Sequence, residues 1–375
     1  MVVANPPYMG SSNMNGWLSG WTKKRYKEVC KDLCTCFIKR GFSLSDDRGY
    51  EALITSDTCM YISSFEKMRK EIIKRTSIVC FVDTRGTNAH PDVFDANAGW
   101  VLWNHPGANI KGSYFKLNHP IPEKSQRLLE ALAHPNCGWF YRTDASSFEA
   151  IPGNPIAYWA TASIISAFNN PLLGDLIPVK KGLDTGDNDT FLRLWHEVSI
   201  SRMGIGSKNQ KEFFASRAKW APHDKGGEYR KWYGNKEWVI NWENNGSALK
   251  SSSANLRSER YYFNDAVTWN SLSSGLCSFR LSDYGAISNT AGSSMFPRQE
   301  TLLYLALMNS SVVRRLFEFL APTLNYSAGP VGQIPRACIT HKAVIEGLAS
   351  DSVANVKQDW NSFETSWDFT RHPLV

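Results

Sequence analysis

The chain has 375 residues, 42% of them hydrophobic, and a formal net charge of +7. This length and apolar content predict a large core and two or more domains. No apolar run approaches a membrane span, and the N-terminus lacks a signal-peptide pattern, so we predict a cytoplasmic protein without membrane contact. The eight cysteines form no C-x-x-C pair and no Cys/His cluster at zinc spacing, which favours free thiols and no metal site.

The N-terminal part of the chain alternates short apolar runs with amphipathic segments. Helical spacing predicts helices at 23–41 and 63–75, the second capped by Ser63 or Ser64. Strand–helix alternation predicts a parallel sheet with helices on its faces, so we assign residues 1–115 to an α/β domain. The apolar runs predict strands at 2–4, 50–55, 77–83 and 98–103.

Residues 104–124 are rich in Gly, Pro and Asn, and we expect the hinge between domains there. The remainder, residues 116–375, has shorter and more irregular elements separated by Gly, Ser and Asn turns. Near its end, residues 300–320 show the spacing of one strong helix. We therefore predict an α+β domain for this part of the chain.

The positive charge is concentrated in residues 199–260, which hold 12 Lys and Arg against 6 Asp and Glu. Aromatic residues are interleaved with these cations. Basic side chains neutralise phosphates and aromatic faces stack on bases, so the stretch favours contact with nucleic acid; the alternative is a solvated face over an aromatic core. The DNA-binding candidates are Lys225, Arg230, Lys231, Trp232, Tyr233 and Lys236.

Two features of this half of the chain allow more than one interpretation. Tryptophan and tyrosine occur both in protein cores and in contacts with bases, so Trp232 and Tyr233 could have either role. The acidic run around Asp184 and Asp187 could accept hydrogen bonds from base amino groups, but such residues also cap turns, which is the interpretation we favour.

The segment with the clearest chemistry is Asn5-Pro6-Pro7-Tyr8, directly after the strand expected at 2–4. An exocyclic amino group is a poor nucleophile because its lone pair is delocalised into the ring. The Asn5 side-chain oxygen and the Pro6 carbonyl could accept hydrogen bonds from both N–H groups and favour a tetrahedral nitrogen. Pro7 stiffens the turn, and Tyr8 offers a ring to a base rotated out of the duplex.

Asn5-Pro6-Pro7-Tyr8-Met9-Gly10, followed by Asp32-Leu33-x-x-x-Phe37, resembles successive motifs of N6-adenine DNA methyltransferases. The resemblance implies a partial Rossmann-like methyltransferase sheet and S-adenosylmethionine as methyl donor. It also implies a cofactor site that includes Asn5, Asp32, Leu33 and Phe37. Val93-Phe94 resembles the position of a second base-stacking aromatic, although Phe94 could equally be an ordinary core residue.

Four further segments of the downstream half carry a second resemblance: 182–195, 226–235, 291–297 and 322–335. They resemble the PglX type of adenine methyltransferase from BREX phage-defence systems. The resemblance implies that residues 116–375 form a target-recognition domain for double-stranded DNA and that other phage-defence subunits could be partners.

The family's glycine-rich cofactor turn does not occur in this sequence. Gly204-Ile205-Gly206 lacks a preceding strand, and the glycines at 329–332 lie between a polar loop and Ile334-Pro335. We therefore expect residues 1–115 to be the C-terminal half of a catalytic domain. On this interpretation the cofactor site is incomplete, and the chain needs a missing N-terminal half to methylate.

Two other functions remain open on the sequence alone. The same turn could serve methylation of an RNA base or a protein amide, although the long basic, aromatic domain argues against these compact enzyme classes. Alternatively, the chain could be a non-catalytic DNA-binding or specificity module.

Overall fold

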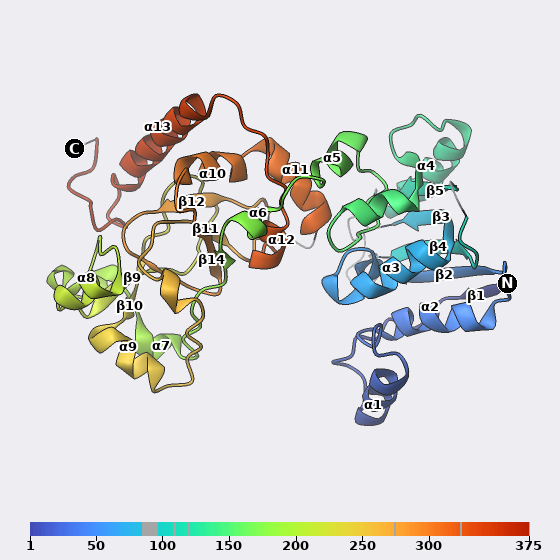
Figure 1. Cartoon of the computed structure of the whole chain (residues 1–375), viewed down its shortest axis with the longest axis horizontal. Helices are drawn as coiled ribbons and strands as arrows, with labels where there is room; N and C mark the ends of the chain where they lie inside the picture. Colours follow the sequence, from blue (N-terminus) through green and yellow to red (C-terminus); the bar gives the residue numbers. More distant parts are fainter. Residues whose placement is uncertain (85–96, 108–109, 119, 274, 323–324, 375) are drawn as a thin grey trace. The chain divides into compact units, whose positions relative to one another are not determined.

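The computed structural model describes residues 1–84, 97–107, 110–118, 120–273, 275–322 and 325–374. The chain divides into two compact units, Met1–Asn169 and Asn170–Val375 (Figure 1). Both are mixtures of helices and strands, as predicted. Among the described residues, no helix combines the length and the apolarity that crossing a bilayer requires.

The first unit is built on a six-stranded sheet with strand order β1-β2-β4-β3-β5-β6. Two strand pairs, β1 with β2 and β3 with β5, are parallel, while β4 and β6 run antiparallel to their neighbours. The predicted parallel sheet is therefore a mixed one. The strands are β1 Val2–Ala4, β2 Tyr50–Ser56, β3 Ser77–Asp83, β4 Asn97–Trp103, β5 Lys111–Lys116 and β6 Phe140–Asp144.

The helices of this unit are α1 Gly16–Arg25, α2 Leu33–Leu44, α3 Glu66–Arg75, α4 Ile121–Ala133 and α5 Ala162–Ala167. The single helix predicted at 23–41 is wrong, because α1 ends at Arg25 and Asp32 caps a new helix. The cap predicted at Ser63 or Ser64 is also wrong. These serines lie in a 3-10 turn, and α3 follows it without a side-chain cap.

The hinge predicted at 104–124 and the domain boundary predicted at 115/116 do not coincide with the division between the compact units. Residues 111–116 form β5, which pairs with both β3 and β6. The sheet therefore continues past residue 116, and the first unit ends only at Asn169.

The core of the first unit lies between the sheet and its helices and is rich in aromatic rings. Phe81 meets Trp100 edge-on at 4.7 Å between centroids, and Tyr114 stacks on Tyr158 at 5.2 Å. The buried Trp100 indole donates a 2.9 Å hydrogen bond to Thr55 Oγ1, so its polar atom is satisfied. This packing holds β2, β3, β4 and β5 in register beside the loop that follows β1.

The second unit contains two four-stranded sheets, ordered β13-β9-β10-β8 and β12-β11-β14-β7. The strands are β7 Val179–Lys180, β8 Leu192–Leu194, β9 Trp220–Asp224, β10 Trp238–Asn241, β11 Ala266–Asn270, β12 Phe279–Ser282, β13 Ile287–Ser288 and β14 Gly292–Met295. The helices are α6 Leu173–Leu176, α7 Asn188–Phe191, α8 Gln210–Ala215, α9 Glu243–Lys250, α10 Thr301–Met308, α11 Ser311–Leu320, α12 Ala328–Gly332 and α13 Lys342–Trp360. These short elements form the predicted α+β arrangement.

The helix predicted at 300–320 is interrupted. Ser310 caps α11 by accepting a hydrogen bond from Val313 N at 3.3 Å, and Asn309 turns its side chain to β12. The Asn309 amide donates to Phe279 O at 2.9 Å and accepts from Phe279 N at 3.2 Å. The break thus ties the α10–α11 corner to the sheet.

Arg69 on α3 is completely buried and acts as a clamp within the first unit. Its guanidinium donates to the carbonyls of Cys59 and Ile62 on one side and of Gly153 and Asn154 on the other. These bonds join the turn after β2 to the loop that leads to α5.

We predict that Arg69→Met lowers the free energy of unfolding by about 3 kcal/mol or more, because several buried carbonyls lose their donor. Urea denaturation followed by circular dichroism measures the change. Lys67→Met, on the same helix but with a 75% exposed side chain, is the matched control and should change little. Equal effects of the two substitutions would contradict the clamp.

Glu51 on β2 is a buried carboxyl group, 1% exposed, whose two oxygens have no hydrogen-bond partner among the described residues. It lies directly against Gly41 of α2, where any side chain would collide with it. Burial raises the pKa of Glu51 from 4.5 to about 8, so the carboxyl is largely protonated in the folded protein at neutral pH.

This pKa predicts that Glu51 makes the fold less stable as pH rises. Between pH 4.5 and about 8 the folded chain retains a proton that the unfolded chain releases. The free energy of unfolding therefore falls across this window, by about 1.4 kcal/mol per pH unit at most. Glu51→Gln should remove this slope and be more stable than the parent at pH 8. Glu149→Gln, at an exposed position, is the control and should keep the slope.

Candidate active site

The Asn5-Pro6-Pro7-Tyr8 turn lies at the end of β1, with Asn5, Pro7 and Tyr8 exposed and Pro6 buried. The Tyr8 hydroxyl donates a 3.2 Å hydrogen bond to Asn5 Oδ1. An amide oxygen has two lone pairs, so Asn5 Oδ1 can still accept a second hydrogen bond. No described residue donates to the Pro6 carbonyl. Asn5 Oδ1 thus keeps the capacity for one more hydrogen bond, and the Pro6 carbonyl accepts none from the described residues.

Backbone hydrogen bonds tie this turn to the start of α2. Leu33 N donates to Met9 O at 3.0 Å, Ser11 N donates to Lys31 O at 2.9 Å, and Gly10 pairs with Asp32 as an isolated bridge. The structure therefore brings together two motifs that lie more than twenty residues apart in the sequence. This contact places the segment from Asn5 to Tyr8 close to Asp32 and Leu33.

Asp32 has a structural task at this position. Its carboxylate accepts a 3.0 Å hydrogen bond from Cys34 N and caps α2. A capping carboxylate satisfies a backbone donor that the helix leaves unpaired. The side chain predicted to bind cofactor is thus engaged by the helix terminus, next to the turn.

Leu33 and Phe37 lie four residues apart on α2 and line an open pocket of about 510 Å³. Its other walls come from Trp21, Arg25, Tyr26, Cys36 and Arg40. The Trp21 and Tyr26 rings are 5.4 Å apart, and Phe37 is 40% exposed. The sequence analysis missed Trp21 and Tyr26. The spacing of Trp17 and Trp21 indicates a shared helix face, but it does not indicate that Trp21 lines this pocket.

The environment of the turn keeps the Tyr8 phenol and the nearby thiols Cys36 and Cys59 protonated. Burial raises the pKa of Tyr8, and the nearby Cys34 and Cys59 raise it further, so the phenol remains a donor at neutral pH. Burial also raises the pKa of Cys59 to about 12 and that of Cys36 to about 12. These thiols therefore do not act as nucleophiles here.

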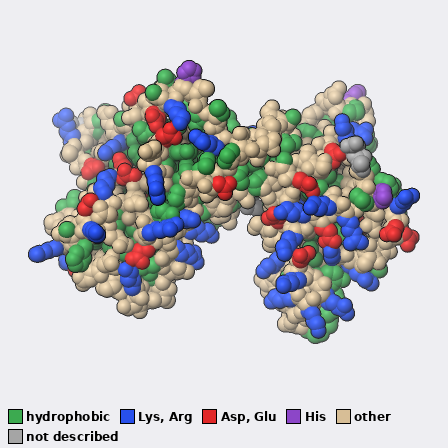
Figure 2. Space-filling model, in the orientation of Figure 1, with side chains coloured by type: hydrophobic (Ala, Val, Ile, Leu, Met, Phe, Trp, Pro, Cys, Tyr) green, Lys and Arg blue, Asp and Glu red, His purple; other side chains and the backbone are tan. Residues whose placement is uncertain are grey.

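Phe94, the second predicted stacking residue, lies outside the described residues. In the parts of the chain that the structure describes, no group of three or more His, Cys, Asp or Glu side chains could hold a metal ion. Lys and Arg side chains gather over α1 and α2 of the first unit (Figure 2).

Three of the predicted DNA contacts in the second unit are partly exposed and pack on aromatic or backbone groups. Lys225 Nζ lies 3.6 Å from the centroid of the Trp238 ring, and the Arg230 guanidinium lies 5.0 Å from that of Trp360. Lys231 Nζ donates to Asn309 O at 3.1 Å. Their positions allow contact with a phosphate.

Two of the predicted contacts are instead buried, which corrects the sequence-based prediction. Tyr233 is 2% and Lys236 is 3% exposed. Lys236 Nζ lies between two tyrosine rings, 3.5 Å from the centroid of Tyr233 and 3.6 Å from that of Tyr284. Burial lowers the pKa of Lys236 to about 7. Both residues are core residues and cannot contact DNA in this structure.

Trp232 is half-buried and has a left-handed backbone conformation, with φ of 72°. Its backbone pairs with β12, accepting from Leu281 N and donating to Phe279 O, each at 2.8 Å.

The acidic run has the capping role that we favoured: Asp187 caps α7 through Thr190 N at 3.1 Å, and Asp184 accepts from Gly186 N at 3.3 Å.

Comparisons with known proteins show which proteins this chain is similar to. Residues 1–90 match the family described as Eco57I restriction-modification methylase. The whole chain is 36% identical to the adenine-specific methyltransferase BrxX of Escherichia coli O9:H4 (strain HS). It is 34% identical to the adenine-specific methyltransferase PglX of Lacticaseibacillus casei (strain Zhang). The chain spans only 30% and 32% of the length of these relatives.

Solved structures share the fold. The Type IIL restriction-modification enzyme MmeI in complex with DNA matches with a TM-score of 0.57 at 12% identity, covering 98% of this chain and 50% of that chain. A nuclease-deletion mutant of the Type ISP restriction-modification enzyme LlaGI, with a DNA substrate mimic, matches with a TM-score of 0.53 at 11% identity, covering 94% and 41%. The predicted fold class is thereby confirmed. The match to both relatives covers the whole of this chain and about a third of their length. The chain is therefore a relative of the adenine-specific methyltransferases BrxX and PglX.

Proposed function

We propose that this chain carries the reactive turn and the DNA-recognition part of an adenine-specific DNA methyltransferase of a phage-defence or restriction-modification system. The observation that supports this most directly is the exposed Asn5-Pro6-Pro7-Tyr8 turn, positioned by α2, in a relative of adenine-specific methyltransferases. The substrate would be an adenine in double-stranded DNA that has rotated out of the helix.

Asn5 and Pro6 would make the adenine amino group a better nucleophile. Asn5 Oδ1 accepts from one N–H of this group and the Pro6 carbonyl from the other, which stabilises the tetrahedral nitrogen formed during methyl transfer. The hydrogen bond from Tyr8 orients Asn5 Oδ1 for this task. The Tyr8 ring, 37% exposed, is available to stack on the extruded base, with Phe94 as the proposed second stacking residue.

The proposed methyl donor is S-adenosylmethionine, which supplies a methyl group carried on a positively charged sulfur. The pocket beside the turn suits the adenosine part of such a molecule, because Leu33, Phe37, Trp21 and Tyr26 offer apolar and aromatic walls. We propose Asn5 and Asp32 at the edge of this site. The sequence contains no glycine-rich cofactor turn, so we propose that full affinity needs a further N-terminal half.

We propose different functional roles for the two compact units. The first, with the turn and the pocket, holds the reacting groups, and the second recognises the target sequence. Within the second unit we retain Lys225, Arg230 and Lys231 as phosphate contacts and Trp232 as an adjoining contact. Tyr233 and Lys236 are omitted because they are buried.

We predict that Asn5→Ala lowers the rate of DNA methylation about 100-fold or more, as expected for loss of a group that stabilises the transition state. A chimera of BrxX, in which this chain replaces the matching segment, supplies the remaining parts. N6-methyladenine in incubated DNA is measured by mass spectrometry. Asn13→Ala, an exposed asparagine just beyond the turn, is the control and should leave the rate unchanged.

Retained methylation in the Asn5→Ala chimera, with a normally folded protein, would show that the turn is not catalytic. Methylation by the unfused chain would contradict the proposal that its cofactor site is incomplete. Methylation of RNA or protein with none in DNA would favour the other methyltransferase classes.

We predict that Phe37→Ala weakens binding of S-adenosylmethionine to the same chimera about tenfold, since a stacking surface is lost. Isothermal titration calorimetry measures this without any turnover. Leu44→Ala, at an exposed position on the same helix and outside the pocket, is the control. Unchanged affinity in Phe37→Ala would remove this pocket from the proposed cofactor site.

A further inference from the structure

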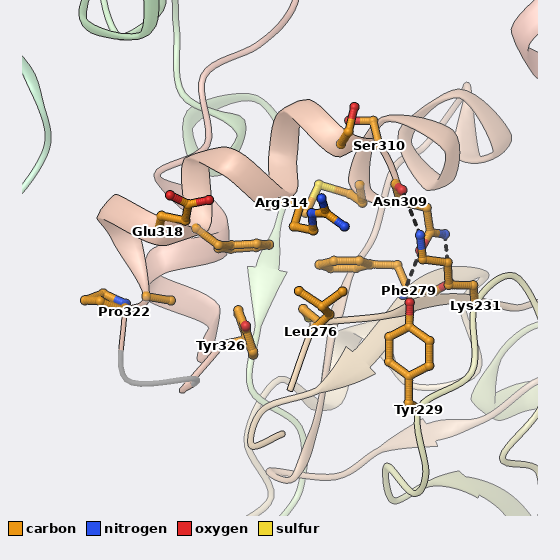
Figure 3. Close-up of a pocket in the computed structure, with 15 residues that line it drawn as sticks. Tyr229, Lys231, Leu276, Phe279, Asn309, Ser310, Arg314, Glu318, Pro322 and Tyr326 are labelled. Carbon is orange, nitrogen blue, oxygen red and sulfur yellow. Dashed lines mark hydrogen bonds between the residues drawn. The ribbon is translucent and has the colours of Figure 1, made fainter. Parts of the chain in front are cut away.

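The second unit contains a pocket of about 320 Å³ that the proposed catalytic site does not use (Figure 3). It lies between the loop before β10, the segment that leads into β12, and the α10–α11 corner. A volume of this size is at the lower end for small-molecule sites, and is suited to one planar ring system with a few attached atoms. It is too small for a helix or a duplex.

The floor of the pocket is apolar and aromatic. Phe279 and Phe317 have nearly parallel rings, 6° between planes and 6.2 Å between centroids, and Tyr326 meets Phe317 edge-on at 5.0 Å. Two more apolar surfaces stand at the mouth: Tyr229 is 51% exposed and Leu276 is 46% exposed. The Tyr229 ring stacks on no other described ring, so one of its faces is available to a flat ligand.

The rim of the pocket is positively charged. Arg314 is exposed, and its guanidinium has no acceptor among the described residues. Figure 3 shows its side chain reaching from α11 toward the side of the pocket where Lys231 lies. Lys231 Nζ donates to Asn309 O at 3.1 Å and forms no ion pair with any described carboxylate. The carboxylate of Glu318, which also lines the pocket, is paired with Arg315.

An uncommitted guanidinium and an ammonium group beside an exposed aromatic face match the chemistry of a nucleotide. The planar guanidinium fork suits a phosphate, and the aromatic face suits a base. An inorganic anion would contact only the cationic side chains of the rim, and an apolar ligand would contact only the apolar floor of the pocket.

We propose that this pocket binds a single nucleotide, with the phosphate at Arg314 and Lys231 and the base against Tyr229 and Leu276. The nucleotide could be free in solution or part of a DNA strand, unpaired and lifted out of the helix. The second source rests on the proposed function, because it requires that the chain binds DNA; the first source does not.

The test measures two kinds of binding to the full chain. Calorimetry follows 2′-deoxyadenosine 5′-monophosphate, with inorganic phosphate as competitor. Fluorescence anisotropy follows a labelled duplex with one unpaired adenine and the same duplex fully paired. The variants are Arg314→Ala and Tyr229→Ala, both at exposed positions, and the control is Lys211→Ala, which removes an exposed cation from α8 outside the pocket. Thermal melts establish that all variants are folded.

We expect at least one ligand, the mononucleotide or the duplex with the unpaired adenine, to bind better than phosphate or the paired duplex. Arg314→Ala and Tyr229→Ala should each weaken that binding about tenfold, the value for losing one charged hydrogen bond or one stacking contact. Lys211→Ala should leave it unchanged. Binding that Asn5→Ala weakens while Arg314→Ala and Tyr229→Ala do not would place the nucleotide at the catalytic turn and would also overturn the proposal.

Three further results would overturn the proposal. Neither ligand shows the preference; or phosphate competes as well as the mononucleotide; or Tyr229→Ala behaves like Lys211→Ala while only Arg314→Ala weakens binding. The last two results would leave a simple anion site without a base.

Discussion

The geometry of the candidate active site depends on the backbone pairing between the segment after β1 and the start of α2. A strand of three residues cannot by itself hold an exposed turn in one conformation. The bonds from Leu33 N to Met9 O and from Ser11 N to Lys31 O add a second attachment on the far side of the turn. Asn5 and Tyr8 are therefore held at both ends, and their mutual hydrogen bond forms between fixed partners rather than in a mobile loop.

The same pairing explains why α2 begins where it does. Asp32 contributes to the bridge with Gly10 through its backbone and to the helix cap through its carboxylate. The chain must leave the helical conformation before Asp32 to make this bridge, which is why 23–41 is not one helix. Apolar spacing alone predicted a continuous helix because it contains no information about a distant backbone partner.

The sequence predicted β1, β2, β3 and β4 of the first unit well because each contains an apolar run whose burial the sheet requires. It predicted less well what depends on tertiary packing. Residues 104–124 have the composition of a linker, yet β5 forms there because β3 and β6 supply hydrogen-bond partners on both sides. At the 300–320 segment the break at Asn309 arises from its hydrogen bonds to Phe279, which no local propensity indicates.

The residues of the candidate site likewise fall into those that the sequence predicted and those that it did not. Asn5, Tyr8, Asp32 and Leu33 could be found from sequence because their chemistry is carried by short motifs. Trp21 and Tyr26 could not be assigned to the pocket, since only the return of the chain toward α2 places them there.

The basic, aromatic stretch of the second unit shows how far charge counting can mislead. A lysine in sequence predicts an exposed cation, but Lys236 is held between two tyrosine rings, and its lowered pKa reflects the cost of burial. Cation–π contact also engages Lys225 and Arg230, whose heads pack over indoles while remaining partly exposed. The positive charge that this stretch presents to a partner is therefore smaller than its composition indicates.

In the first unit, by contrast, most of the basic side chains of residues 16–40 are exposed. Residues 16–40 hold seven Lys and Arg against two acidic residues, and all but one of these cations, Lys39, are exposed. Arg25 and Arg40 line the pocket of Trp21 and Phe37, and Arg40 lies on α2, the helix that holds the reactive turn. A polyanion drawn to this charge would arrive beside Asn5 rather than at a distance from it, so the electrostatic attraction and the proposed chemistry would act on the same face of the unit.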